Sequence, residues 1–420
     1  MNQSPFHDWF QSPDYRPLDN ILATPERNWL ELWLAVAVVA LAPVNLLRAD
    51  AFYFTASDAI AVLVLPLMIL NRSLPVSPLG PGTMLWNFGL ATMIALLLTS
   101  GLLYGDVIRS LTVCGQYLFA YFLLSYVVVP RPRDDIALMM KALVYSIAVM
   151  CLYGIYVVDV VGERFTTFVS GSGRFLGFVE RENECAALIA LSVPLLLWLG
   201  FSRKLPPYAV TVLLILDVYA IMLTGSNTGL FAIVYAVACF LSIAVTWRQG
   251  VLALACASLL FVSLTTWGRD FTPAIFQTRV LGALETGDIE EAGTFSGRVD
   301  LIDEAIDLAE NSTVLGIGAD SYREVSRYGA PVHNTYLLLW VESGFFGMIG
   351  FIMMLLGGLV LGIATLRRPG GRIDGICALT SVSLFALMLN AFPHMYGRFF
   401  VVPILLAMAP GAGLVRHARQ

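Results

Sequence analysis

The string FSGRVDLIDEAIDLAEN at residues 295–311 and the string PVHN at residues 331–334 lie within a polar stretch from Gly268 to Asn334. Apolar runs too long for the core of a water-soluble protein flank this stretch on both sides. The sequence therefore predicts a large loop on one face of a membrane, carried by membrane-spanning helices, with the chemistry in the loop.

The composition of the 420-residue chain is that of a polytopic integral membrane protein. Hydrophobic residues make up 58% of it and charged residues 13%, and the mean hydropathy is +0.77. Too few polar residues remain to cover a soluble globule of this size. The apolar residues form long unbroken runs and do not alternate with polar ones, so we expect an all-α protein and not a barrel.

Windows of roughly 20 apolar residues predict about twelve membrane-spanning helices. The predicted spans are 29–47, 51–70, 84–103, 110–129, 138–161, 183–201, 207–223, 227–246, 249–267, 335–366, 373–392 and 398–415, with a break in the tenth at Glu342-Ser343-Gly344. This divides the chain into an N-terminal tail (1–28), helices one to nine (29–267), the large loop with short helices (268–334), helices ten to twelve (335–415) and a C-terminal tail (416–420).

The positive charges predict the orientation of the chain. One alternating set of connectors holds most of them: Arg72, Arg131, Arg133, Lys141, Arg203, Lys204, Arg248, Arg367, Arg368, Arg372, Arg416 and Arg419. The positive-inside rule places this set, and with it both termini, in the cytoplasm. The loop 268–334, the connector 162–182 and the turns 224–229 and 393–398 then face outward.

The outward connector at 162–182 carries Arg174 and Arg181 at the entrance of the next span. An arginine guanidinium grips phosphate oxygens through two parallel hydrogen bonds and keeps its charge. These residues are candidates for binding a phosphorylated substrate; alternatively they pair with Glu180 and Glu182 or reach toward the membrane surface.

The next outward turn, at 224–229, reads TGSNTG and contains Asn227. Such a turn exposes backbone N–H groups that can bind an anion, or serves only as a helix cap. Asn227 is thus a candidate substrate-binding residue.

In the large loop, the spacing of Val299, Ile302, Ala305, Ile306 and Ala309 predicts a helix that lies on the membrane platform, with Ser296 as its N-cap. Its acids, Asp300, Asp303, Glu304, Asp307 and Glu310, are expected to face water. Arg298 stands in the first turn, where the helix dipole disfavours a positive charge, and this placement points to a function.

His333 and Asn334 follow Pro331 where the loop re-enters the membrane. Histidine exchanges a proton near neutral pH, so His333 beside outward-facing arginines is a candidate general base, although a lone histidine can equally be structural. Asn334 is a candidate for orienting the imidazole or a sugar. None of the acidic residues stands at a spacing from a histidine that is typical of metal ligands, so we expect no metal site.

Together these residues resemble the O-antigen ligase and polysaccharide polymerase (Wzy-type) superfamily over about residues 165–365. The resemblance rests on an arginine-bearing connector that leads to Asn183 and Pro194, the polar turn, and the motifs SGR at 296–298, GIG at 316–318, HNTYL at 333–337 and ESGFFG at 342–347. It implies an α-helical fold of the GT-C type in the bacterial inner membrane, with a periplasmic active site.

The resemblance further implies a glycosyltransferase that passes a glycan from undecaprenyl diphosphate to an acceptor hydroxyl without a metal, nucleotide sugar or other cofactor. A histidine at the position of His333 is implied to be catalytic, and arginines like Arg298 and Arg174 to hold the diphosphate. The family turn commonly carries an arginine where this chain has Asn227, so the diphosphate contacts are expected from Arg174, Arg181 or Arg298.

Within this superfamily, the two remaining hypotheses differ in the acceptor of the glycan. A polymerase of O-antigen or exopolysaccharide transfers to another lipid-linked glycan, and a ligase transfers to a lipid A core sugar. The absence of an outer basic cluster suited to a phosphorylated core favours the polymerase. A transporter or lipid flippase is the alternative of another class; it would use charges within the spans, where Asp58, Asp159 and Asp217 are scattered. We expect membrane lipid as a partner, and no nucleic acid.

Overall fold

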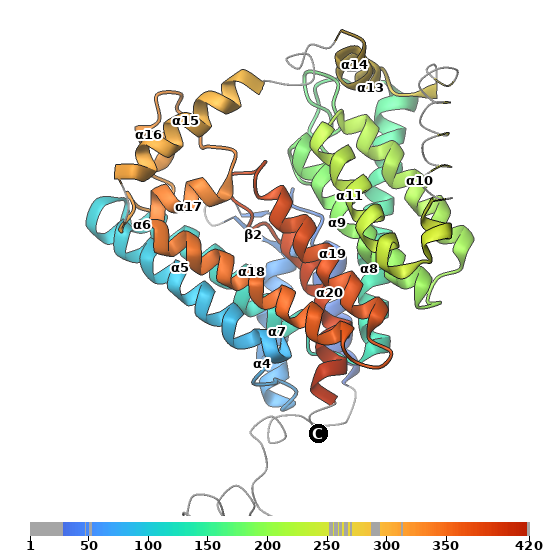
Figure 1. Ribbon diagram of the computed structural model, residues 1–420, viewed down its shortest axis with the longest axis horizontal. Coiled ribbons are helices and arrows are strands. Elements are labelled where there is room, and N and C mark those ends of the chain that lie inside the picture. The colour runs from blue at the N-terminus through green and yellow to red at the C-terminus, as the bar shows by residue number, and fades with distance from the viewer. Residues whose placement is uncertain are drawn as a thin grey trace, which may run out of the picture.

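The computed structural model describes residues 28–46, 48–49, 53–251, 271–286, 295–311 and 314–417, with residues 255, 259, 263 and 268. These residues are mainly helical, with one short hairpin of β1 and β2 (Figure 1). The elements in chain order are α3 (Trp29–Leu41), β1 (Arg48–Ala49), β2 (Phe54–Thr55), α4 (Ala56–Leu70), η1 (Gly80–Gly82), α5 (Thr83–Tyr104), α6 (Val107–Tyr117), η2 (Leu118–Leu123), α7 (Leu124–Val128), α8 (Arg133–Ile155), η3 (Tyr156–Val161), α9 (Glu182–Phe201), α10 (Pro207–Thr224), α11 (Asn227–Ala244), α13 (Ala274–Phe276), η5 (Gln277–Leu281), α14 (Gly282–Thr286), α15 (Phe295–Asn311), α16 (Tyr322–Val325), α17 (Thr335–Ser343), α18 (Phe345–Leu366), α19 (Arg372–Met388) and α20 (Arg398–His417).

Within the described part of the chain, 8 helices are long and apolar enough to cross a membrane. They are Gly80–Tyr104, Val107–Val128, Arg133–Val161, Glu182–Phe201, Pro207–Thr224, Asn227–Ala244, Phe345–Leu366 and Arg398–Arg416. They correspond to predicted spans three to eight, the second part of span ten, and span twelve. The prediction of an all-α membrane protein is confirmed at this level.

The remaining predicted spans differ from expectation or stay untested. Helices α3 and α4 are shorter than the spans predicted there, because Pro43 follows the end of α3 and the Thr55–Asp58 capping box starts α4 only at Ala56. Helix α19, at predicted span eleven, has 17 residues. Predicted span nine and the tail 1–28 fall largely outside the described residues, as does the end of the C-terminal tail, so the count of about twelve stays a prediction.

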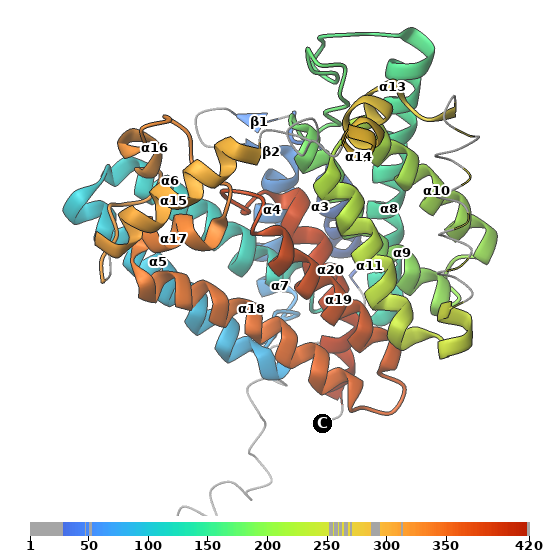
Figure 2. The ribbon, with the colours of Figure 1, turned by 45° about the horizontal axis from the view of Figure 1, so that its top comes forward.

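The expected break in predicted span ten lies at Gly344, which separates α17 from α18. Its φ of +80° is a conformation that side-chain-bearing residues rarely adopt, and an added Cβ would lie 2.2 Å from the Val314 carbonyl oxygen. The break lets α17 turn away from α18 and pack against α15 and α5, while α18 crosses the molecule (Figure 2).

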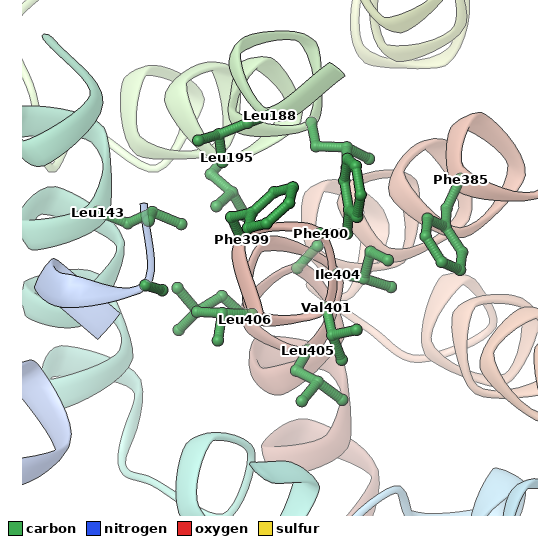
Figure 3. Close-up of a cluster of buried hydrophobic side chains, with 14 of the residues drawn as sticks. Leu143, Leu188, Leu195, Phe385, Phe399, Phe400, Val401, Ile404, Leu405 and Leu406 are labelled. Atoms are coloured by element: carbon green, nitrogen blue, oxygen red, sulfur yellow. The ribbon is translucent and has the colours of Figure 1, made fainter. Parts of the chain in front are cut away.

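Helices α9 and α20 form the centre of the fold. The most apolar part of α9 is 83% buried and that of α20 is 89% buried, more than in the other candidate spans. Figure 3 shows phenylalanine and aliphatic side chains of α20 in contact with α8, α9 and α19, among them Phe399, Phe400 and Ile404. Helices α5 and α18 pack beside this core at closely apposed glycines: a Cβ on Gly89 would lie 2.4 Å from the Gly350 carbonyl oxygen.

The loop elements α13 to α16 lie at one end of the molecule and the C-terminus lies at the other (Figures 1 and 2). This arrangement agrees with the predicted division of the connectors between two faces. Which face meets the cytoplasm stays a prediction from the positive charges.

A buried ion pair ties the start of α20 to α4. Arg398 Nε lies 2.5 Å from Asp58 Oδ1, the two side chains are 5% and 0% exposed, and the guanidinium also stacks over Phe119 and bonds to Gln116. Asp58 therefore has a structural partner, which weakens the reading in which it lines a transport path.

We expect Arg398→Gln to lower the free energy of unfolding by about 3–5 kcal/mol, because it leaves the Asp58 carboxylate buried without its counter-charge. Thermal unfolding in detergent measures the loss. Arg109→Gln is the matched control: its pair with Glu324 is solvent-exposed, so its removal should change stability far less. Equal melting temperatures for the two variants would contradict this expectation.

Candidate active site

Arg174 lies where α9 begins and α10 ends. The connector before it closes on itself through a bridge between Val169 and Phe175, and Phe175 N donates to the Leu223 carbonyl at 3.0 Å. Arg174 is 9% exposed; its Nε donates to the Thr224 carbonyl at 2.7 Å and its Nη2 to Asn183 Oδ1 at 3.0 Å. Its Nη1 lies 3.7 Å from Glu182 Oε1, so one edge of the guanidinium has only a loose ion pair.

The turn between α10 and α11 packs directly on this arginine. Gly225 ends α10 with a φ of +57°, and a Cβ placed on it would lie 3.7 Å from Arg174 Nε and 3.2 Å from Arg279 Cδ. Ser226 caps α11 by accepting from Gly229 N at 3.2 Å, and half-buried Asn227 is the first residue of that helix. The turn therefore acts as a helix cap, and it also brings Arg279 to Arg174.

Arg279 is a site residue that the sequence reading did not identify. It lies in η5, whose neighbours Phe276 and Leu281 are buried with Met222 of α10. The sequence signal that would have found it is a single arginine between buried apolar residues of a short helical segment. Contact with α10 fixes its backbone beside the α10–α11 turn.

Arg298 comes to the same region from α15. The helix begins at Phe295, one residue before the predicted N-cap at Ser296. Its buried stripe contains Leu301, Ala305 and Ala309, whereas Val299 and Ile306 of the predicted apolar face are each 42% exposed. Arg298 is half-buried and interacts electrostatically with both Arg174 and His333.

The acids of α15 are largely solvent-exposed, as predicted, with one exception. Glu304 is partly buried and accepts hydrogen bonds from Ser326 Oγ and Arg327 N, each at 2.7 Å. Tyr322 is 0% exposed and donates to the Leu301 carbonyl at 3.2 Å, so it belongs to the loop core. These bonds fasten α15 to α16 and fix the position of Arg298.

His333 lies immediately before α17 and is half-buried. Its Nδ1 is buried, with no hydrogen-bond partner among the described residues. Burial and the positive charge of Arg298 lower the pKa of His333, Arg181 adds to the effect, and the Pro331 carbonyl partly opposes it. The imidazole is therefore biased toward its neutral form, which is the form that accepts a proton.

The electrostatic interactions of Arg174 identify a cluster of positive side chains. Burial lowers the pKa of Arg174, and Arg279 and Arg298 lower it further, while Glu182 acts in the opposite direction. Arg279 and Arg298 therefore each lie close enough to Arg174 to repel it. We call these three residues the arginine cluster. Arg181 stands at its edge, with a side chain 68% exposed and 3.9 Å from Glu184.

Asn334 has a structural task. It is the N-cap of α17, accepting from Leu337 N at 3.1 Å, and its Nδ2 donates to Asn390 Oδ1 at 3.3 Å. The neighbouring Thr335 N donates to the Leu389 carbonyl at 2.8 Å. The bonds hold the residue after His333 against the end of α19, so Asn334 fixes the backbone that carries the imidazole.

A cavity of about 760 Å³ lies elsewhere, at the turn between α5 and α6. Tyr104, Asp106, Ile317 and Ser321 are among its lining residues, and none of the candidate site residues lines it. A search for groups of 3 or more histidine, cysteine, aspartate and glutamate side chains able to hold a metal ion finds none in the described ranges. Arg298, within electrostatic range of both Arg174 and His333, connects the two parts of the candidate site.

No curated protein matches the chain. Residues 209–352 match the family model described as O-antigen ligase (Wzy_C), a range that includes α10, the α10–α11 turn, Arg279, Arg298 and His333. The family indicates membrane glycosyltransferase activity of the ligase or polymerase type. On this match, residues 209–352 are an O-antigen ligase (Wzy_C) segment, which supports the resemblance of the chain to the O-antigen ligase and Wzy-type superfamily.

Proposed function

We propose that the protein is a metal-independent, inverting glycosyltransferase of the bacterial inner membrane. It transfers a glycan from undecaprenyl diphosphate to a sugar hydroxyl at the periplasmic face, with both termini in the cytoplasm. One observation carries the proposal: segments far apart in sequence bring Arg279 and Arg298 within electrostatic range of Arg174, and Arg298 is also within range of the half-buried His333 imidazole, which is biased toward its neutral form.

The arginine cluster binds the diphosphate of the donor. Bond breaking at the anomeric carbon places additional negative charge on the leaving phosphate, and fixed positive groups stabilise that charge as it forms. Arg174 contributes the guanidinium edge that now faces Glu182, while Arg279 and Arg298 supply further donors. Arg181 and Asn227, at the margin, complete the contacts.

His333 acts as the general base. It accepts the proton of the acceptor hydroxyl while that oxygen attacks the anomeric carbon, and the bond from this carbon to the diphosphate oxygen breaks. The electron pair of the broken bond remains on the diphosphate, so a single displacement gives an inverted glycosidic bond. Asn334 holds the chain so that the imidazole keeps its orientation.

The lipid tail of the donor lies against the membrane-facing surfaces of α10 and α11. Val212 and Ile215 of α10 are 61% and 62% exposed, and Phe231 and Val234 of α11 are 59% and 65% exposed. An apolar surface beside the arginine cluster suits a polyprenyl chain whose diphosphate is bound at the outer ends of these helices.

For the acceptor, we propose another lipid-linked glycan, which makes the protein a polymerase of O-antigen or exopolysaccharide. The description of the matching family model favours the ligase alternative, in which the acceptor is a lipid A core sugar. Both acceptors use the same donor chemistry. A transporter or flippase is less well supported, because the arginine cluster lies at helix ends and not within a span, and because Asp58 is paired with Arg398.

The test is transfer by purified protein in liposomes containing an undecaprenyl-diphosphate-linked repeat unit. A ladder of products with release of undecaprenyl diphosphate supports the polymerase. A single transfer that requires added lipid A core supports the ligase. No transfer with either acceptor, together with movement of the lipid between leaflets, would reject the glycosyltransferase proposal in favour of transport.

The pH dependence of transfer should follow the environment of His333. Since burial and Arg298 lower its pKa, activity should persist below pH 6.5, the ordinary pKa of histidine. Arg298→Gln removes one of the lowering influences, so the acid limb should move to higher pH in the activity that remains. Initial rates of both proteins between pH 4.5 and 8 measure the shift. An unchanged acid limb would show that another group controls it.

A further inference from the structure

The connector between α19 and α20, residues 389–397, lies beside His333. Four hydrogen bonds join the start of α17 to this connector and to the end of α19. Thr335 Oγ1 donates to the Phe392 carbonyl at 2.7 Å, Tyr336 Oη to the Ala386 carbonyl at 2.8 Å and Thr335 N to the Leu389 carbonyl at 2.8 Å, and Asn334 Nδ2 contacts Asn390 Oδ1 at 3.3 Å. The connector therefore has a fixed position relative to the imidazole.

The connector carries polar and aromatic side chains that the donor chemistry does not use. Asn390 is exposed, and its Nδ2 donates to the Leu387 carbonyl at 3.1 Å, within its own helix end. The rings of His394 and Tyr396 lie 5.5 Å apart at an angle of 36°. His394 Nδ1 is buried without a hydrogen-bond partner among the residues that the structure describes.

Arg323 continues this surface from the loop side. Its charge acts on His394 and Tyr396, and its Nη2 lies 3.0 Å from Asp320 Oδ1. Because Asp320 balances Arg323, this region lacks the accumulated positive charge of the arginine cluster. We call Asn390, His394, Tyr396 and Arg323 the acceptor strip.

Two requirements of the proposed reaction apply to the strip. In an inverting displacement the acceptor oxygen approaches the anomeric carbon from the side opposite the leaving group. The acceptor sugar must therefore reach His333 without occupying the arginine cluster. The hydrogen bonds of Arg174 go to Thr224 and Asn183, and not to residues 389–397. The connector is therefore a second surface near His333, separate from the residues that hold Arg174.

We propose that the acceptor strip binds the acceptor saccharide, with Asn390 as the hydrogen-bonding residue next to His333. An asparagine amide both donates and accepts, which suits adjacent sugar hydroxyls. The Tyr396 ring packs edge-on against buried Tyr117, so the partly exposed Tyr396 and His394 would contribute hydrogen bonds through the phenol hydroxyl and the imidazole. The low net charge of the strip suits a neutral saccharide and not a phosphate. This inference rests on the proposed function, because it assigns the second substrate of the same site.

Direct binding tests the strip independently of turnover. The protein in lipid nanodiscs is titrated with two probes: a soluble repeat-unit oligosaccharide prepared from the surface polysaccharide of the producing bacterium, and undecaprenyl diphosphate without a glycan. Asn390→Ala and Tyr396→Phe should each weaken oligosaccharide binding about tenfold, the effect of one lost hydrogen bond, and leave undecaprenyl diphosphate binding unchanged. Arg298→Ala should show the reverse pattern.

The outcomes separate the two proposals. If both strip variants bind the oligosaccharide as tightly as the wild type does, or if the wild type binds only undecaprenyl diphosphate, the strip is not the acceptor site and the donor proposal stands. If the strip variants lose the oligosaccharide but no protein binds undecaprenyl diphosphate, the strip is supported and the donor proposal fails. Melting temperatures check that the variants fold. Tyr396→Phe keeps the ring and its packing, so it should melt like the wild type. If it melts lower and binds both probes more weakly, the loss of binding is structural and the strip is overturned.

Discussion

His333→Ala should reduce the turnover number for glycan transfer by about 10²–10⁴-fold, the usual contribution of a general base. The substitution removes the proton acceptor, while the arginine cluster remains able to bind the donor. Product formation at saturating donor measures the loss. The equilibrium constant for undecaprenyl diphosphate should change little, since His333 bears no positive charge in its favoured neutral form.

His333→Gln is the control for shape, because it keeps polar atoms near the imidazole position without accepting a proton. It should be as inactive as the alanine variant and should melt close to the wild type. Turnover within a factor of three of the wild type in either variant would remove His333 from the mechanism and leave the arginine cluster to be tested alone.

Arg298→Ala should reduce transfer by about 10²–10³-fold, comparable to removing one donor from a site that stabilises developing charge. It also deprives the ground-state diphosphate of one charge, so donor affinity should fall along with turnover. Arg298→Lys should recover part of the loss, because lysine restores the charge without the planar pair of donors. Steady-state kinetics against donor concentration separate the two effects.

Arg327→Ala is the matched control for Arg298→Ala. Arg327 also belongs to the large loop and is exposed, and it contacts Glu304 through its backbone N–H, which alanine retains. It should transfer glycan at the wild-type rate. Equal losses in both variants would indicate a general effect of loop charge and would contradict a specific role for Arg298.

Much of the architecture could be predicted from the sequence because membrane spans follow from long apolar runs. The break at Gly344 was also predictable, since a polar residue and a glycine interrupt an otherwise continuous run. The lengths of α3 and α4 were not, because a capping box and a proline set helix ends more sharply than hydropathy does. Hydropathy likewise did not identify Leu301 as a buried residue of α15, since the platform that covers the helix is built by distant segments.

The residues of the candidate site were also only partly predictable from the sequence. Arg174, Arg298 and His333 could be selected because each stands in a recognisable motif, and the structure places Arg298 within electrostatic range of both Arg174 and His333. Arg279 and Asn390 carry no such motif. Their relevance comes from tertiary contacts, of η5 with α10 and of the α19 end with α17, and these contacts join residues far apart in sequence.

The ion pair between Arg174 and Glu182 has a consequence for release of the lipid product. Transfer converts a diphosphate bound at both ends into one with a free terminal phosphate, which carries more negative charge and would remain on the arginine cluster. Glu182, 3.7 Å from Arg174, is an intramolecular competitor for that guanidinium. Under the proposed function, each return of the carboxylate to its partner would remove one contact to the spent carrier, so we expect Glu182 to hasten the departure of undecaprenyl diphosphate and to limit product inhibition.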